Sequence, residues 1–156
     1  MFPPDFINAE RIGCQLEIGS KKRVLEYLGG LLAASTPGLA PEAVFDRLLE
    51  RERLGSTGLG HGIALPHART PDVDKPVGAF IQLAAGVDFD AIDDQPVDLA
   101  FALLVPQEAT EEHLQLLAKL ASMFSNEPFC AILRGSEDAA QLLQHLRDWE
   151  ASAERA

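Results

Sequence analysis

A histidine that follows a glycine-rich stretch is the first candidate for chemistry in this chain. The stretch is RERLGSTGLGHGIALPHAR, residues 51–69, and a short apolar run within it leads to Pro66-His67. Because glycine costs backbone entropy, a cluster of glycines indicates positive φ angles or a close approach of the backbone to another group. Such a loop can direct backbone N–H groups at an anion, and a histidine can act as a nucleophile toward phosphorus or carbon. An incidental histidine after a helix-to-strand connection is the simpler alternative.

The spacing of the glycines does not fit the common nucleotide-binding motifs. A dinucleotide fingerprint would need glycine in place of Ile63 and a strand before the loop, whereas this loop follows a helical pattern. A P-loop needs Gly-Lys-Ser/Thr, and residues 55–69 contain no lysine. A shared metal is disfavoured as well, because His61 and His67 would lie roughly 20 Å apart on an extended chain. We therefore expect neither a metal nor a cofactor in this site.

Phosphoryl transfer through His67 fits these residues better. A neutral imidazole is a good nucleophile near pH 7, and the transferred group is anionic and needs fixed donors. Arg51 can supply a permanent charge. It continues the buried stripe of Val44 and Leu48, so its side chain should point inward or along the rim next to the loop, although a cation there also complements a helix C-terminus. His113 falls near a helix N-terminus, whose dipole favours the neutral ring; a half-buried core histidine is the alternative. The donors expected in the glycine loop are Ser56, Thr57, Gly58 and Gly60.

Helical and strand patterns alternate along the chain, and these elements must position the candidate residues. Three helices are predicted from their N-terminal residues. Ser20 and Thr110 are good N-caps, and Pro41 suits the first position of a helix. A shorter helix is predicted over residues 127–133, and a last one opens at Ser136. Residues 88–98 are rich in aspartate but lack a calcium-loop pattern, so a solvated acidic connection is expected. The predicted strands cover residues 14–18, 63–65, 77–83 and 99–105, and the second of them is expected to carry His67 at its end.

Composition and charge favour a cytoplasmic domain without nucleic-acid partners. The 156 residues are 47% hydrophobic, which suits one domain over residues 1–156 with a full core. A net charge of −11 disfavours binding to nucleic acid. The opening MFPPDFINAE lacks a signal-peptide pattern, and the longest apolar run, residues 99–105, is too short for direct membrane insertion. Interleaved helices and strands predict an α/β fold in which helices cover a sheet.

Four segments of the chain are SKKRVLEYLGGLLA, RERLGSTGLGHGIALPH, VDFDAIDDQPVDLAFALLVP and EEHLQLLAKLA. Together they resemble a known family, the IIA domains of the mannitol/fructose class (type 2) in the phosphoenolpyruvate-dependent phosphotransferase system. The resemblance is strongest to the nitrogen-regulatory branch of this family and extends over nearly the whole chain. His61 and Ala68-Arg69 depart from that branch, which often has Asn and Gly-Lys there, and are closer to some fructose-type sequences.

The resemblance implies a mixed central sheet flanked by helices on both faces and a phosphoryl group carried on Nε2 of His67. It implies supporting roles for Arg51, in stabilising the phosphoryl charge, and for His113, in orienting it by a hydrogen bond. The implied donor is a histidine phosphocarrier protein, and no independent small-molecule catalysis is expected. The implied output is regulation of partners such as potassium-transport components or sensor kinases. The alternatives are a IIA component that passes phosphate to a IIB protein for fructose- or mannitol-type transport, and an interaction module that is never phosphorylated.

Overall fold

The computed structural model describes residues 2–3, 5–34, 36–108 and 110–155, with the side chains of residues 110, 154 and 155 left aside. Within these residues, six strands form one mixed sheet in the order β1-β5-β6-β3-β2, and β4 also pairs with β6. The strands are β1 (Ile12–Leu16), β2 (Gly58–Gly60), β3 (Ile63–Ala64), β4 (His67–Thr70), β5 (Val77–Val87) and β6 (Val97–Pro106).

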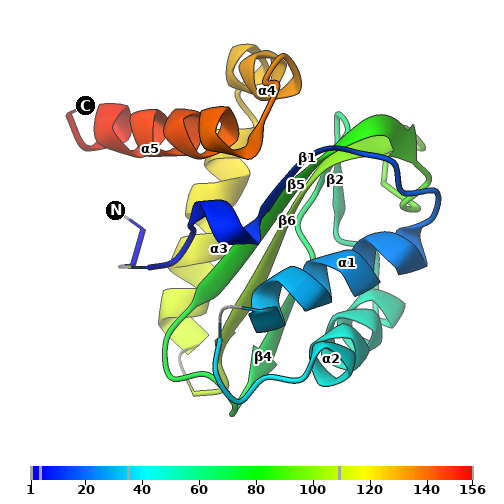
Figure 1. Ribbon diagram of the computed structural model, residues 1–156, viewed down its shortest axis with the longest axis vertical. Helices are drawn as coiled ribbons and strands as arrows, with labels where there is room; N and C mark the ends of the chain where they lie inside the picture. The colour runs from blue at the N-terminus through cyan, green and yellow to red at the C-terminus, as the bar shows by residue number, and fades with distance from the viewer. Residues whose placement is uncertain (1, 4, 35, 109, 156) are drawn as a thin grey trace.

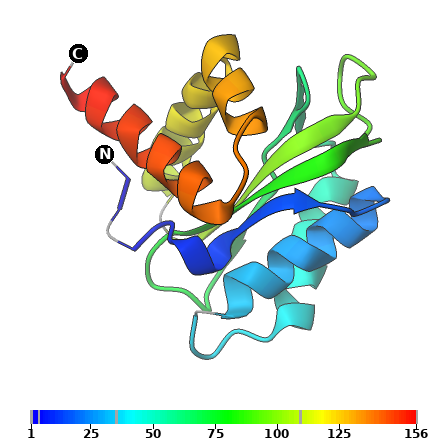
Figure 2. The same cartoon turned by 45° about the horizontal axis from the view of Figure 1, so that its top comes forward.

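Helices cover both faces of the sheet, as predicted. Figures 1 and 2 show helices packed on both faces, with the strands running between the two layers. The first layer holds α1 (Lys21–Ala34) and α2 (Pro41–Arg53), and the second holds α3 (Thr110–Phe124), α4 (Glu127–Arg134) and α5 (Ala139–Arg155); a short 3₁₀ helix covers Ala9–Arg11. Among the described helices, none combines the length and the apolar character needed to cross a membrane.

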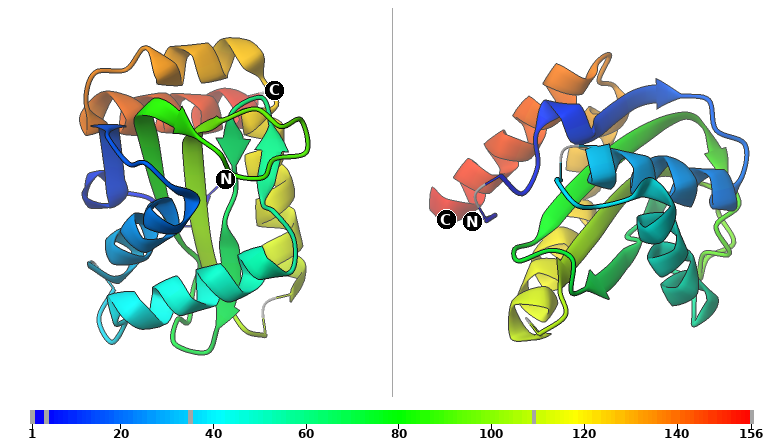
Figure 3. Two further views of the ribbon diagram at one scale, coloured as in Figure 1. Left: turned by 90° about the vertical axis from the view of Figure 1, so that its right-hand side faces the viewer. Right: turned by 60° about the horizontal axis from the view of Figure 1, so that its bottom comes forward.

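Strand β6 is the centre of the sheet because it is buried on both faces. Its side chains alternate, so that Leu103 packs with the layer of α3 to α5 and Leu104 packs with α1 and α2. A strand covered on both faces reads as a continuous apolar run, which explains the sequence from Leu99 to Val105. The two views in Figure 3 show the sheet enclosed in this way.

Two short strands, β3 and β4, lie in succession along one edge of β6, and both run parallel to it. The break between them falls at Pro66, which has no N–H to donate, while its carbonyl accepts a hydrogen bond from the Leu103 N–H at 2.9 Å. The chain then resumes pairing at His67, opposite Leu103. The prediction that His67 ends a strand was therefore wrong, since it begins β4.

The helix starts and the helix-to-helix contact follow from local chemistry. Ser20 caps α1 as predicted, because its Oγ accepts a hydrogen bond from the Arg23 N–H at 3.2 Å. Gly29 allows α1 and α2 to approach closely, since a Cβ there would lie 3.1 Å from the backbone nitrogen of Phe45. The predicted cap by Thr110 lies outside the described side chains, although α3 does begin at this residue.

Candidate functional site

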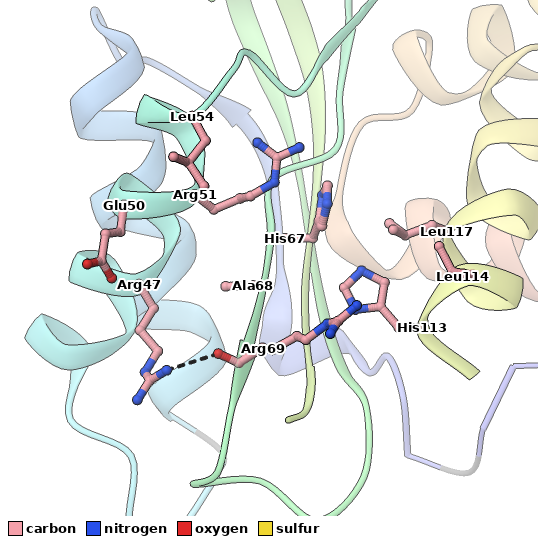
Figure 4. Close-up of a pocket in the computed structure, with 10 residues that line it drawn as sticks. All are labelled: Arg47, Glu50, Arg51, Leu54, His67, Ala68, Arg69, His113, Leu114 and Leu117. Atoms are coloured by element: carbon pink, nitrogen blue, oxygen red, sulfur yellow. Dashed lines mark hydrogen bonds between the residues drawn. The ribbon is translucent and has the colours of Figure 1, made fainter. Parts of the chain in front are cut away.

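A pocket of about 580 Å³ opens at the edge of the sheet, between α2, β4 and α3. It brings together Arg51 from α2, His67 from β4 and His113 from α3, which are far apart in the sequence (Figure 4). The other residues that line it are Arg47, Glu50, Leu54, Ala68, Arg69, Leu114 and Leu117.

The position of His67 on β4 determines which of its ring nitrogens can react. Ala68 packs with the layer of α1 and α2, so His67 faces the α3 side of the strand. Its Nδ1 lies 2.8 Å from the carbonyl oxygen of Leu65. Because a carbonyl can only accept a hydrogen bond, Nδ1 must carry the proton. Nε2 is then the unprotonated nitrogen, and its lone pair is free to act as a nucleophile.

His113 lies directly beside His67. The two ring centroids are 5.3 Å apart and the ring planes are inclined at 81°. The His113 side chain is buried, and its Nδ1 has no hydrogen-bond partner among the described residues. Since buried polar atoms are normally paired, an unpaired ring nitrogen next to a second histidine is more typical of a functional site than of a core.

Burial and nearby guanidinium groups keep both imidazoles neutral at pH 7. For His67, burial is the largest cause that lowers the pKa, and Arg51 and Arg69 lower it further, against the opposing effects of the Leu65 hydrogen bond and Glu52. For His113, burial is the largest cause, and the nearby His67 ring and the guanidinium groups of Arg69 and Arg51 lower the pKa further, to about 4. A neutral His67 keeps its nucleophilic lone pair, and a neutral His113 can still donate one hydrogen bond.

Arg51 lies in the last turn of α2, on the rim of the pocket. Its Nη1 donates a hydrogen bond to the carbonyl of Gly55 at 2.9 Å, and Figure 4 shows its side chain directed toward His67. The fully buried side of α2 is completed by Glu52, four residues after Leu48. Arg51 thus takes the rim position, one of the two orientations that the apolar stripe predicts.

Of the four residues expected as donors in the glycine loop, Ser56, Thr57 and Gly58 already hydrogen-bond to other groups of the protein. The Ser56 hydroxyl donates to the Phe89 carbonyl at 2.7 Å, and the Gly58 N–H donates to Ser56 Oγ. The Thr57 N–H and hydroxyl both donate to the Glu52 carboxylate, at 2.9 and 2.6 Å. None of these residues, nor Gly60, is among the described residues that line the pocket. Their role as phosphoryl donors stays a prediction, and the geometry offers it no support.

Two residues that contribute to the site were not among the sequence candidates. Glu52 is buried, binds Lys21 Nζ at 2.8 Å and fixes the start of the glycine loop through Thr57. Its spacing of four residues from Leu48 could have revealed it. Arg69 lines the pocket two residues after His67, and the alternation of side chains on a strand could have placed both on one face.

The acidic connection after β5 is largely exposed, as expected, and it also holds the glycine turn in place. His61 and Gly62 adopt positive φ angles of 57° and 82° in this turn. Asp93 Oδ2 accepts the His61 N–H at 2.8 Å, and Arg134 donates to the His61 carbonyl at 2.8 Å while it pairs with Asp98 at 2.9 Å. His61 is thus tied to the far end of the loop and does not line the pocket.

The fold and this histidine pair define a phosphotransferase domain of the IIA class. Residues 5–149 match the family described as phosphoenolpyruvate-dependent sugar phosphotransferase system, EIIA 2, and the chain belongs to this family. A nitrogen regulatory protein of Pseudomonas aeruginosa is 48% identical over 130 residues, which cover 83% of this chain and 84% of the relative. The crystal structure of nitrogen regulatory protein IIA-Ntr from Neisseria meningitidis matches with a TM-score of 0.85 at 43% identity, covering 90% of this chain and 96% of that one.

A relative whose name refers to a sugar-specific component is also similar to this chain. The PTS system fructose-specific EIIA component of Haloferax volcanii is 41% identical over 118 residues, which cover 76% of this chain and 77% of the relative. The similarity therefore extends to proteins of both the regulatory and the sugar-transport branches.

Proposed function

We propose that this chain is a phosphocarrier that accepts a phosphoryl group on Nε2 of His67. The observation that carries the proposal is the hydrogen bond from Nδ1 to the Leu65 carbonyl, which leaves the Nε2 lone pair available and holds the ring in place. Arg51 and His113 are the groups that would stabilise and orient the bound phosphoryl group.

The transfer step balances without a metal or a cofactor. The Nε2 lone pair attacks the phosphorus of a phosphohistidine on a histidine phosphocarrier protein. One N–P bond forms as the donor's N–P bond breaks, and the electron pair of the broken bond stays on the donor's ring nitrogen. A protein donor fits the rim of the pocket, where Leu54 and Leu114 are 84% and 60% exposed, because exposed apolar side chains beside a site favour protein contact.

The output that we propose is regulatory, through the binding of partners such as potassium-transport components or sensor kinases. The support for this branch is the similarity to proteins named nitrogen regulatory protein. The second candidate is a IIA component that passes its phosphoryl group to a IIB protein, and the fructose-specific relative supports it. Incubating the phosphorylated chain with a IIB protein from the same genome separates the two, since only the second function predicts rapid transfer.

Intact-mass measurement after incubation with the upstream phosphodonors tests the proposal. The wild-type protein should gain the mass of one phosphoryl group, and His67→Ala should gain none while it stays folded, because the half-buried His67 lies at the edge of the sheet. His145→Ala on α5 is the matched control and should be labelled like the wild type. A full mass gain in His67→Ala would refute the assignment of the acceptor, and an unlabelled wild type would favour the interaction module that is never phosphorylated.

A further inference from the structure

Arg69 shares the functional face of β4 with His67. The two residues are separated by Ala68, which packs with α1 and α2 on the other side of the sheet. In the parallel pairing with β6 they lie opposite Leu103 and Val105, both of which belong to the core beneath α3. Residues i and i+2 of a strand point to one face, so the side chains of His67 and Arg69 are both directed to the α3 side.

The backbone of Arg69 is fixed while its charged group is left available. Its carbonyl accepts a hydrogen bond from Arg47 Nη1 at 3.1 Å, which ties β4 to α2. Its side chain is exposed and extends toward His113 in Figure 4. In the part of the chain that the structure describes, no acceptor or carboxylate engages this guanidinium. Arg51 differs, because its guanidinium is already bonded to the Gly55 carbonyl.

Arg69 is also close enough to act electrostatically on both histidines. Its positive charge opposes protonation of His67 and of His113 and so contributes to the lowered pKa of each ring. A charge that disfavours a cation at this place favours an anion there. A phosphoryl group carries about −1.5 to −2 charges, and the planar fork of a guanidinium matches its oxygens better than an ammonium does.

We propose that Arg69 is a second phosphoryl-binding residue, which holds the group on His67 from β4 while Arg51 holds it from α2. The inference rests on the proposed function. It assigns to the side chain of Arg69 a role distinct from that of Arg51, since the free guanidinium gains its first anionic partner when His67 is phosphorylated.

The test compares Arg69→Gln, Arg69→Lys and the control Arg53→Gln, which removes an exposed charge from the end of α2 outside the pocket. Each protein is equilibrated with the phosphorylated histidine phosphocarrier protein at one fixed ratio, and the labelled fraction is measured by intact mass. Arg69→Gln should lower the equilibrium constant for labelling by about threefold to tenfold. This is the change expected when one hydrogen bond between charged groups is lost at a partly solvent-exposed place. Arg69→Lys should recover part of the loss, and Arg53→Gln should match the wild type.

A second readout does not depend on phosphorylation. NMR titration of the unphosphorylated proteins should show that Arg69→Gln raises the pKa of both His67 and His113, whereas Arg53→Gln does not. The same spectra establish that each variant is folded. Labelling of Arg69→Gln equal to that of Arg53→Gln, or Arg69→Lys no better than Arg69→Gln, would overturn the inference while the proposed function stands. A wild-type protein that takes up no phosphoryl group would overturn the proposed function and the inference together.

Discussion

Burial of His113 makes the stability of this protein depend on pH, and His113→Gln is the change that exposes this dependence. His113 is 5% exposed, and its pKa is lowered from 6.5 to about 4, mainly by burial and further by the neighbouring His67, Arg69 and Arg51. Glutamine keeps a polar side chain of similar reach but has no group that titrates in this range. The substitution therefore removes the proton-linked part of the stability and leaves the helix in place.

The sign of the effect follows from which state binds the proton. Above pH 6.5 both the folded and the unfolded chain hold His113 neutral, so its lowered pKa costs nothing. As the pH falls from 6.5 toward 4, the unfolded chain takes up a proton that the folded chain refuses, so the free energy of unfolding decreases. At about pH 5 the loss from this residue is at most about 2 kcal/mol, from roughly 1.4 kcal/mol for each unit of pKa difference.

Urea unfolding at about pH 7 and about pH 5 measures this loss directly. The decrease in the free energy of unfolding between the two pH values should be smaller in His113→Gln than in the wild type by up to about 2 kcal/mol. His145→Gln, on α5 and away from the pocket, is the control and should lose as much stability as the wild type. If His113→Gln and the wild type lose equal stability, then the His113 ring takes up its proton without a penalty in the folded state, and the reasoning from its burial is refuted.

Two further predictions concern a charge and a close contact. Arg51→Ala should shift the phosphoryl-transfer equilibrium against the phosphorylated protein by about 1.5–3 kcal/mol, the contribution of a hydrogen bond to a charged group. Arg51→Lys should shift this equilibrium less, because the positive charge remains. Equal equilibria for the wild type and Arg51→Ala at a fixed amount of donor would contradict the prediction. Gly30→Ala should raise the free energy of urea unfolding by up to about 1 kcal/mol, since the described residues leave open space at its Cβ position. Gly29→Ala should lower it, because its Cβ would press on the backbone of Phe45, and equal stability of the two alanine variants would disprove the close packing of α1 on α2.

The elements of this fold were predictable where one periodicity dominates. The helix after Ser20, the strand from Leu99 and the short helix at residues 127–133 all correspond to observed elements, because apolar spacing and caps act locally. The division between β3 and β4 was missed, since it depends on how β6 pairs with both. The apolar run before Pro66 looked like one strand that carries His67 to its end.

The residues of the candidate site were likewise predictable only in part. The family resemblance pointed to Arg51, His67 and His113, and the structure places all three in one pocket. The donors of the glycine loop could not be judged from the sequence, because it does not show that they bond to groups outside the loop, such as the Phe89 carbonyl and the Glu52 carboxylate. Glycine spacing shows that a backbone bends, but it does not show what the bent backbone faces.

The edge position of β4 explains why these three residues can meet at all. A sheet separates the helices on its two faces, so a side chain of α2 and a side chain of α3 cannot reach one another across its middle. Within the described residues β4 pairs only with β6, and its outer edge is open. Arg51 can therefore approach from one layer and His113 from the other, with His67 at the first residue of the edge strand between them (Figure 4). A break in pairing at Pro66 and a short edge strand thus create a place where one phosphoryl group can contact both layers.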